Sequence, residues 1–432
     1  MRGHFLTVLF LICFGLGLVK LFSGGGPLAR AKTEISFWNG WTGPDGVAML
    51  EVIREFNEAN PDIEVSMQRM AWDTYYNKLM VAAMSGRGPE VFVIHASTLP
   101  RMVRAGYLDD VSDLYGPQSG ILRADFEAKV LEQVKFGKKM VAVPLDVHPQ
   151  GMFCNADMLV AAGYKNPDGT PRAPATGEEF IAAMRSMQRV NAKGEHDVWG
   201  FSWTFWRNNF MALVPQFGGR YFDENGKADL TNPGNIAALA YMGKLMNELK
   251  LTPPAESNAG WTGYRQKKVA MLFEGVYMIG DLQNLTDFRY WGAPIPQIGP
   301  KPGTLGDSHC LCIRTGLTGK QRAAAEKFIA FLSDHGLAWA KAGQVPARIS
   351  IRNSPEFQKL QVQSAFAKQL PYLEYPPRTP LLFELIQEID QAVERVLRGD
   401  MTAEKSLKVA NDNVAKAIDR DKLENDKELN GS

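Results

Sequence analysis

The first hundred residues alternate between short apolar runs and segments whose apolar positions recur every three or four residues. The first run contains Ile35 and Phe37, which alternate with polar neighbours as in a half-buried strand. A helical pattern follows and stops at Asn60-Pro61, because proline cannot continue a helix. A second strand and a second helix lead to the run VFVI at 91–94, which has the continuous apolar character of a buried parallel strand. This order of strand, helix, strand, helix, strand predicts a parallel α/β sheet with right-handed crossovers.

The middle of the chain repeats the alternation, with three segments that suit connections between lobes. A strand-like stretch is interrupted by Pro144 and Pro149, and proline is tolerated at sheet edges and in connections rather than in central strands. Residues 292–307 are dense in glycine and proline, and residues 344–350 form a third candidate connection. From Thr379 onward the pattern predicts amphipathic helices with a solvated, charged tail.

The N-terminal residues 1–31 have the pattern of a signal peptide or an N-terminal anchor. Arg2 precedes an apolar run from Phe5 to Val19, and Ala29-Arg30-Ala31 supplies the small residues of a cleavage site. Cleavage after Ala31 would leave 432 − 31 = 401 residues. Cys13 follows leucine and isoleucine rather than a small residue, so we do not expect lipid modification. The sequence therefore predicts export, with a membrane anchor as the alternative.

The composition argues against several classes of partner and site. The 432 residues are 45% hydrophobic with a formal charge of +1, which suits two ordinary domains and argues against nucleic acid as the main partner. Outside the leader only Cys154, Cys310 and Cys312 remain, an odd number that argues against a disulfide framework. No cysteine or histidine pair has the spacing of metal ligands with a matching second pair, so neither a metal nor a cofactor is expected.

Polar and aromatic residues follow the predicted strands, where open α/β sheets bind their ligands. Asn39 and Trp41 come just after the first strand, and His95 and Ser97 come after the buried strand. An amide, an indole and hydrogen-bonding side chains at this edge suit a polyhydroxylated ligand. The alternative is a turn in which Trp41 packs as a lid and His95 satisfies local hydrogen bonds.

Asp146 and His148 lie two residues apart in an extended segment, so their side chains point the same way. They suit recognition of sugar hydroxyls at a crossing between lobes, with a purely structural role as the alternative. No nucleophile or third orienting residue stands at a recognisable spacing from them.

Aromatic residues are concentrated in the segment that contains Trp203, Phe205 and Trp206. Their density indicates that one or two face a ligand while the others enter the core; Trp261 is a weaker candidate of the same kind. A second strand end brings Glu274, Gly275 and Tyr277 together, with glycine allowing close approach and tyrosine offering a flat face.

Motifs of catalysis are missing from the sequence. It contains no G-x-S-x-G, no H-E-x-x-H, no Walker A motif and no G-x-G-x-x-G after a strand. The alternative from another class is a secreted glycan hydrolase that uses Asp146 and Glu274 as its two carboxylates.

Several segments, in order, resemble the extracellular solute-binding proteins of ABC transporters, in the sugar-binding group similar to maltodextrin- and glycerol-phosphate-binding proteins. The matching segments include ISFWNGW, VPLDVHPQGMFCNADMLVAAGY, KKVAMLFEGVY and GQVPARIS, and the resemblance extends from Thr33 to about Ile418. It implies a periplasmic-binding-protein-like α/β fold with two doubly wound lobes, hinge crossings and a ligand cleft between them. Lobe 1 would take residues 32–148 and 305–345, and lobe 2 residues 149–304 and 346–432.

The resemblance also implies a function and a set of contacts. The protein would be an exported, non-catalytic and monomeric receptor that delivers a sugar or oligosaccharide to an ABC permease, with a sensor for a membrane kinase as the alternative on the same fold. It makes Tyr277 the residue that stacks on the sugar, adds Arg348 near the lobe connection and leaves Glu274 a supporting role. The expected ligand contacts are Asn39, Trp41, His95, Ser97, Asp146, His148, Trp203, Phe205, Trp206, Trp261, Gly275, Tyr277 and Arg348.

Overall fold

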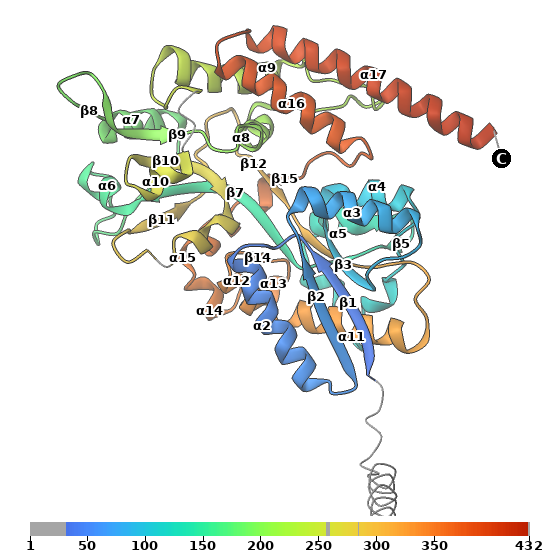
Figure 1. The fold of residues 1–432 in the computed structure, drawn as a ribbon. Coiled ribbons are helices and arrows are strands. Elements are labelled where there is room, and N and C mark those ends of the chain that lie inside the picture. Colours follow the sequence, from blue (N-terminus) through green and yellow to red (C-terminus); the bar gives the residue numbers. More distant parts are fainter. Residues whose placement is uncertain (1–31, 256–259, 284, 431–432) are drawn as a thin grey trace, which may run out of the picture.

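Two sheets lie side by side in the computed structural model, each packed between helices (Figure 1). The structure describes residues 32–255, 260–283 and 285–430. The predicted signal peptide or anchor, residues 1–31, lies outside these described residues. Within them, no helix combines the length and the apolar character needed to cross a membrane.

The first sheet has the order β2-β1-β3-β13-β6. β1 pairs in parallel with β2 and β3, as the alternation in the sequence predicts. β13 returns from much later in the chain and runs antiparallel to both β3 and β6. The bounds are β1 (Thr33–Asn39), β2 (Ile63–Arg69), β3 (Val91–His95), β6 (Val143–Pro144) and β13 (His309–Ile313).

Helices pack around this first sheet, and residues from both parts of the chain share one core. That core includes Phe37 of β1, Phe56 and Phe328 from the helices and Leu311 of β13. We call this part of the molecule the first lobe. Its helices are α2 (Pro44–Ala59), α3 (Trp72–Met84), α4 (Leu99–Arg104), α5 (Ala128–Val134), α11 (Gly319–Asp334) and α12 (Gly336–Lys341), with a small hairpin of β4 (Lys135–Phe136) and β5 (Lys139–Met140).

The second sheet has the order β15-β12-β7-β10-β9-β8, and β11 and β14 also pair with β7. It mixes directions: β10 runs parallel to β9 but antiparallel to β7. We call the part of the molecule built on it the second lobe. The bounds are β7 (Asp146–Asn155), β8 (Arg189–Val190), β9 (His196–Ser202), β10 (Val269–Gly275), β11 (Tyr290–Ala293), β12 (Thr304–Asp307), β14 (Val345–Pro346) and β15 (Leu373–Glu374).

Strand β7 passes from one core to the other. Val147 packs in the core of the first lobe, whereas Met152 packs in a core of the second. All ten residues of β7 are buried, and Pro149 lies inside it opposite Gly306 of β12. The sequence analysis placed this stretch at a crossing between lobes, and Pro149 lies there in a paired strand rather than in a loop. The strand tolerates it because several partner strands each take only part of the length of β7.

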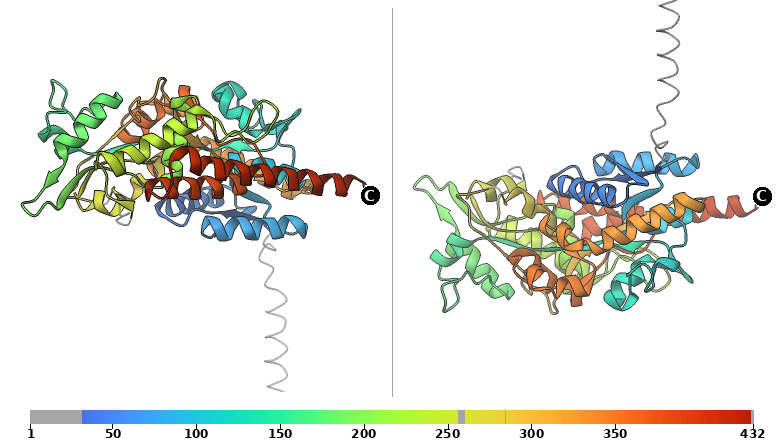
Figure 2. Two further views of the ribbon diagram at one scale, coloured as in Figure 1. Left: turned by 90° about the horizontal axis from the view of Figure 1, so that it is seen from above. Right: turned by 90° about the horizontal axis from the view of Figure 1, so that it is seen from below.

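Two long helices cover the second lobe on one side, as the amphipathic pattern after Thr379 predicts. α16 and α17 pack against each other, and α17 runs along the molecule toward the first lobe (Figure 2). There Arg104 of α4 donates to both carboxylate oxygens of Asp421, at 2.8 and 2.9 Å. The helices of the second lobe are α6 (Ala156–Ala161), α7 (Gly177–Met187), α8 (Trp206–Leu213), α9 (Pro233–Gly243), α10 (Gly260–Arg265), α13 (Ile349–Arg352), α14 (Pro355–Gln358), α15 (Gln361–Ala367), α16 (Leu382–Leu397) and α17 (Ala403–Asn430).

Candidate functional site

The reversed direction of β13 brings its first residue to the edge where β1 and β3 end. His309 is the cross-strand partner of His95, which is the last residue of β3. Trp41, two residues past β1, reaches the same place, and its Nε1 donates to Nε2 of His309 at 3.2 Å. The candidate site therefore lies at the carboxyl edge of the parallel strands.

Asp146 is the fully buried centre of a hydrogen-bond network at this edge. Its Oδ1 accepts the His148 ring Nδ1 at 3.2 Å and the backbone N–H of His309 at 2.9 Å. Its Oδ2 accepts the His309 Nδ1 at 2.7 Å and the Trp339 indole N–H at 2.6 Å. Burial alone would raise the pKa of Asp146, but the two histidines outweigh it and hold that pKa well below its usual range.

The hydrogen bonds of His309 assign a role to each of its two ring nitrogens. An indole N–H can only donate, so the Nε2 that faces Trp41 must be an acceptor without a proton. Nδ1 is then the nitrogen that donates to Asp146. The two ring nitrogens of His309 thus have opposite roles, one as acceptor from Trp41 and one as partner of Asp146.

Three imidazoles meet above this carboxylate. The ring centroids of His148 and His309 are 4.5 Å apart, and His95 lies 4.9 Å from His309 and 5.3 Å from His148. One ring nitrogen from each histidine lies within 4.8 Å of the other two. Nδ1 of His95 bonds to the Tyr76 hydroxyl. Burial lowers the pKa of His95 well below its usual range, and the neighbouring histidines lower it further.

This cluster bears on the expectation that no metal site exists. That expectation compared only ligands close together along the chain, whereas the fold gathers histidines from positions 95, 148 and 309. An argument from ligand spacing along the chain does not apply to residues that the fold brings together. One nitrogen from each of these three histidines could bind the same ion.

Aromatic rings of the first lobe flank the histidines. The half-buried Trp72 stacks on His309 with a centroid distance of 5.5 Å and lies 4.5 Å from His95. Gly40 makes room for it, because a Cβ at that position would come within 2.1 Å of the indole. A residue with any side chain there would displace Trp72 from the site.

Tyr277 approaches the same histidines from the second lobe. Its ring centroid lies 6.2 Å from that of His148, and it lies two residues past the end of β10. The ring covers Gly275, where a Cβ would come within 2.1 Å of it. Burial raises the pKa of Tyr277, as does the nearby Glu274, whereas hydrogen bonds with the Gln150 and Asn208 side chains act against the rise.

Asn208 belongs to the first turn of α8, so the start of that helix lies beside Tyr277. Phe205 precedes the helix with a positive φ of 30° and is 56% exposed. Trp206 is half-buried and packs against the core of the second lobe. An exposed aromatic side chain in a left-handed conformation is costly, and such residues cluster at ligand sites.

Glu274 lies behind Tyr277 and is fully buried. Its Oε1 accepts the Gly275 amide at 2.9 Å, and its Oε2 has no hydrogen-bond partner among the described residues. Burial raises the pKa of Glu274 to about 7.

Two further predicted contacts lie at the same edge but already have partners. Ser97 donates its hydroxyl to Asp307, which also accepts the Ser97 amide at 3.2 Å. Asn39 is buried, and its Oδ1 accepts the Trp41 amide at 3.1 Å, which fixes the turn after β1. Both residues therefore stabilise the turns that surround the site.

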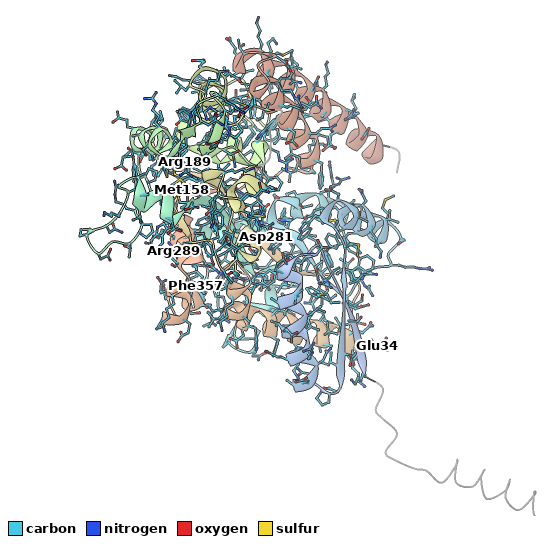
Figure 3. The ribbon with its side chains drawn as sticks, turned by 60° about the vertical axis from the view of Figure 1, so that its left-hand side comes forward. Glu34, Met158, Arg189, Asp281, Arg289 and Phe357 are labelled. Atoms are coloured by element: carbon cyan, nitrogen blue, oxygen red, sulfur yellow. The ribbon has the colours of Figure 1, made fainter. Side chains whose placement is uncertain are left out.

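Three other predicted contacts have partners of their own in the structure. Trp203 is buried in the core of the second lobe against Phe201, so we correct its expected role as a ligand contact. Trp261 packs on Phe153, and its Nε1 donates at 3.1 Å to Asp281, which lies in η7 (Val276–Asp281) beside α2 (Figure 3).

Arg348 forms hydrogen bonds and ion pairs within the protein. Its Nε donates to Asp125 at 2.7 Å, its Nη1 pairs with Asp334 at 3.3 Å and its Nη2 donates to the Gly120 carbonyl at 3.2 Å. With these partners it ties the segment after β14 to the first lobe.

The residues that sequence reasoning missed are His309, Trp72, Tyr76, Asp307 and Trp339. The polar triplet Asp307-Ser308-His309 precedes a buried strand, and only an antiparallel pairing brings the start of a strand to this edge. Trp72 and Tyr76 lie one helical turn apart at the start of α3, which gave a weak signal.

Comparison with known proteins agrees with this architecture. The profile of the family described as "Bacterial extracellular solute-binding protein" matches residues 51–363. The maltotriose-binding protein of Pyrococcus abyssi is 19% identical over 383 residues, which cover 86% of this chain and 79% of that protein. The arabinooligosaccharide-binding protein of Bacillus subtilis is 23% identical over 229 residues, and this match spans about half of each protein, 51% of this chain and 49% of the other.

Solved structures show the same fold. An ABC substrate-binding protein of Listeria monocytogenes in complex with cycloalternan matches with a TM-score of 0.77 at 22% identity, over 90% of this chain and 99% of that chain. This likeness confirms the predicted periplasmic-binding-protein-like fold class. Because the family profile covers most of the chain, the protein belongs to the bacterial extracellular solute-binding family.

Proposed function

We propose that the protein is an exported receptor that binds a sugar or oligosaccharide and delivers it to an ABC permease. The observation that carries this proposal is the pair of half-buried rings, Trp72 from the first lobe and Tyr277 from the second, on either side of one hydrogen-bonding cluster. Aromatic faces stack on the apolar faces of pyranose rings, and imidazole and amide groups bind hydroxyls. The relatives named for maltotriose and arabinooligosaccharides support this class of ligand.

Closure of the two lobes around the ligand is the proposed mechanism. Trp41, His309, His148 and Tyr277 contact one another in sequence, so a ligand enters only if the lobes separate. We propose the division into residues 32–148 with 305–345 and residues 149–304 with 346–432. A ligand that contacts both lobes favours the closed state by its higher affinity for that state.

The proposed ligand contacts are Trp72, His95, His148 and Tyr277, with Phe205 and Trp206 at the rim on the second lobe. Asp146 acts by orienting imidazoles rather than by touching the ligand, since both its oxygens already accept two hydrogen bonds. Gly275 contributes the space that Tyr277 occupies.

A non-catalytic role fits these carboxylates better than glycan hydrolysis. Asp146 has no free lone pair with which to activate water, and Glu274 is buried against its own strand end. The sensor alternative keeps the same site and changes only the membrane partner. We further propose that residues 1–31 direct export and that the receptor acts as a monomer.

Thermal unfolding with a panel of mono- and oligosaccharides tests the proposal. A ligand that binds only the folded state stabilises it by about 2.7 kcal/mol at a concentration of 100 Kd. We expect at least one oligosaccharide to raise Tm and no release of reducing sugar from it. Turnover would favour the hydrolase, and a panel without any shift would overturn the carbohydrate proposal.

A further inference from the structure

We propose that His95, His148 and His309 form a binding site for a divalent transition-metal ion of the Zn²⁺ type. This inference goes beyond carbohydrate binding and does not depend on it. The three rings come from β3, β7 and β13, and one nitrogen from each lies within 4.8 Å of the others. A tetrahedral zinc site has its imidazole nitrogens roughly 3.3 Å apart, so small rotations of these side chains would complete it.

The surroundings of the rings are those of a metal site. Histidines that bind metals usually give their second nitrogen to a carboxylate or another polar group, which fixes the ring. Here Nδ1 of His148 and Nδ1 of His309 both bond to Asp146, at 3.2 and 2.7 Å, and Nδ1 of His95 bonds to Tyr76. Nε2 is therefore the nitrogen left for an ion on each ring.

The buried position of the Asp146 carboxylate gives a second argument. Asp146 is fully buried, and among the described residues no lysine or arginine pairs with it. Asp307 lies opposite His148 in the β12–β7 ladder and accepts hydrogen bonds from Ser97. Buried carboxylates are normally paired with a cation or with a metal site. A dication on the three imidazoles would lie directly beside the buried Asp146 and the partly buried Asp307.

One contact has to open for the ion to bind. Nε2 of His309 accepts the Trp41 indole N–H at 3.2 Å, so the indole must move before His309 becomes a ligand. Three histidines leave a fourth position on a tetrahedral ion, as in sites that bind water or an exogenous ligand. The arrangement offers imidazoles, which suit zinc, copper and nickel better than magnesium.

Thermal unfolding of the chelator-treated protein with ZnCl₂, and with MgCl₂ as the comparison, tests the site. We expect Tm to rise with increasing Zn²⁺ but not with Mg²⁺, and a calorimetric titration to saturate at one Zn²⁺ per chain. His95→Gln, His148→Gln and His309→Gln should each weaken Zn²⁺ binding at least about 100-fold, and Asp146→Asn about 10- to 100-fold. The control is His196→Gln, because His196 stacks on Trp199 in the second lobe and should leave Zn²⁺ affinity unchanged.

The visible absorption of bound Co²⁺ provides a readout on the unmodified protein, so the test holds even if a variant fails to fold. An intense tetrahedral spectrum with one Co²⁺ per chain, displaced by Zn²⁺, supports the site. Absence of that spectrum, or Zn²⁺ affinity unchanged in the folded His148→Gln variant, would overturn it. The sugar panel repeated with chelator separates the two proposals, because a sugar shift there stands without the metal.

Discussion

Asp146 and His309 are joined twice, by the His309 backbone N–H at 2.9 Å and by its Nδ1–H at 2.7 Å to the two oxygens of one carboxylate. The residues are 163 positions apart, at the start of β7 and the start of β13. Asp146 thus holds the first residue of β13 and orients its imidazole at the candidate site.

Removal of this carboxylate should be strongly destabilising. Asp146→Ala leaves the N–H groups of His309, His148 and Trp339 buried without their acceptor, and we expect a loss of about 3–5 kcal/mol in unfolding free energy, measured by urea titration. Glu51→Ala is the control, because Glu51 forms an exposed pair with Arg54 and should cost less than about 1 kcal/mol. Equal losses in the two variants would contradict the central role of Asp146.

The position of the Tyr277 ring can be tested by changing Gly275, over which the ring lies. In Gly275→Ala the new Cβ would come within 2.1 Å of the tyrosine ring, so the ring must leave its place. We expect ligand affinity to fall at least about tenfold, or about 1.4 kcal/mol, in isothermal titration. Gly116→Ala is the matched control, since its Cβ meets nothing within 4 Å and it should bind like the unmodified protein.

The raised pKa of Glu274 makes the stability of the fold depend on pH. Its folded pKa of about 7 lies above the ordinary value of 4.5, so the folded state holds a proton that the unfolded state releases. Its contribution to stability is therefore fully present below about pH 4.5, falls as pH rises to about 7 and is constant above that. Glu274→Gln should raise Tm at pH 8 and have little effect at pH 4.5. An equal change in Tm at both pH values would show that the carboxyl does not titrate in this window.

Replacing Phe205 by glycine should make the fold more stable and ligand binding weaker. Glycine adopts the φ of 30° without strain, so Phe205→Gly should stabilise the fold by about 1 kcal/mol while it weakens ligand affinity. Lys250 also has a positive φ, of 53°, in a different segment, which makes Lys250→Gly the matched control. That variant should gain similar stability and keep its affinity. Loss of affinity in both variants would mean that backbone flexibility, rather than the aromatic ring, determines binding.

Sequence patterns were sufficient for the parallel part of the first sheet, which is β1, β2 and β3. The continuous apolar run of β3 and the alternation in β1 place both strands, and parallel pairing then follows from the helices between them. Since the carboxyl ends of parallel strands share one edge, Trp41 and His95 could be assigned there without a structure. The end of β10 was read in the same way, and Tyr277 does lie beside His148.

The aromatic segment around Trp203 shows where local patterns fail. Trp203, Phe205 and Trp206 are nearly adjacent, yet one is in the core, one is exposed and one is half-buried. The positive φ at Phe205 turns the chain between strand and helix and so decides which ring faces which way. Neither strand nor helix periodicity applies across such a turn.

The sequence by itself determined the order of the first strands and helices and the strand ends that carry polar groups, because these depend on apolar periodicity over short distances. The two-lobed class came from the resemblance to the solute-binding family. Only the tertiary structure decided that His309 and Trp339 join Asp146, and that three histidines share one place. That outcome depends on β13 returning antiparallel beside β3 after more than 200 residues. Contacts of this range are set by the packing of whole lobes, which leaves no periodic trace in the chain.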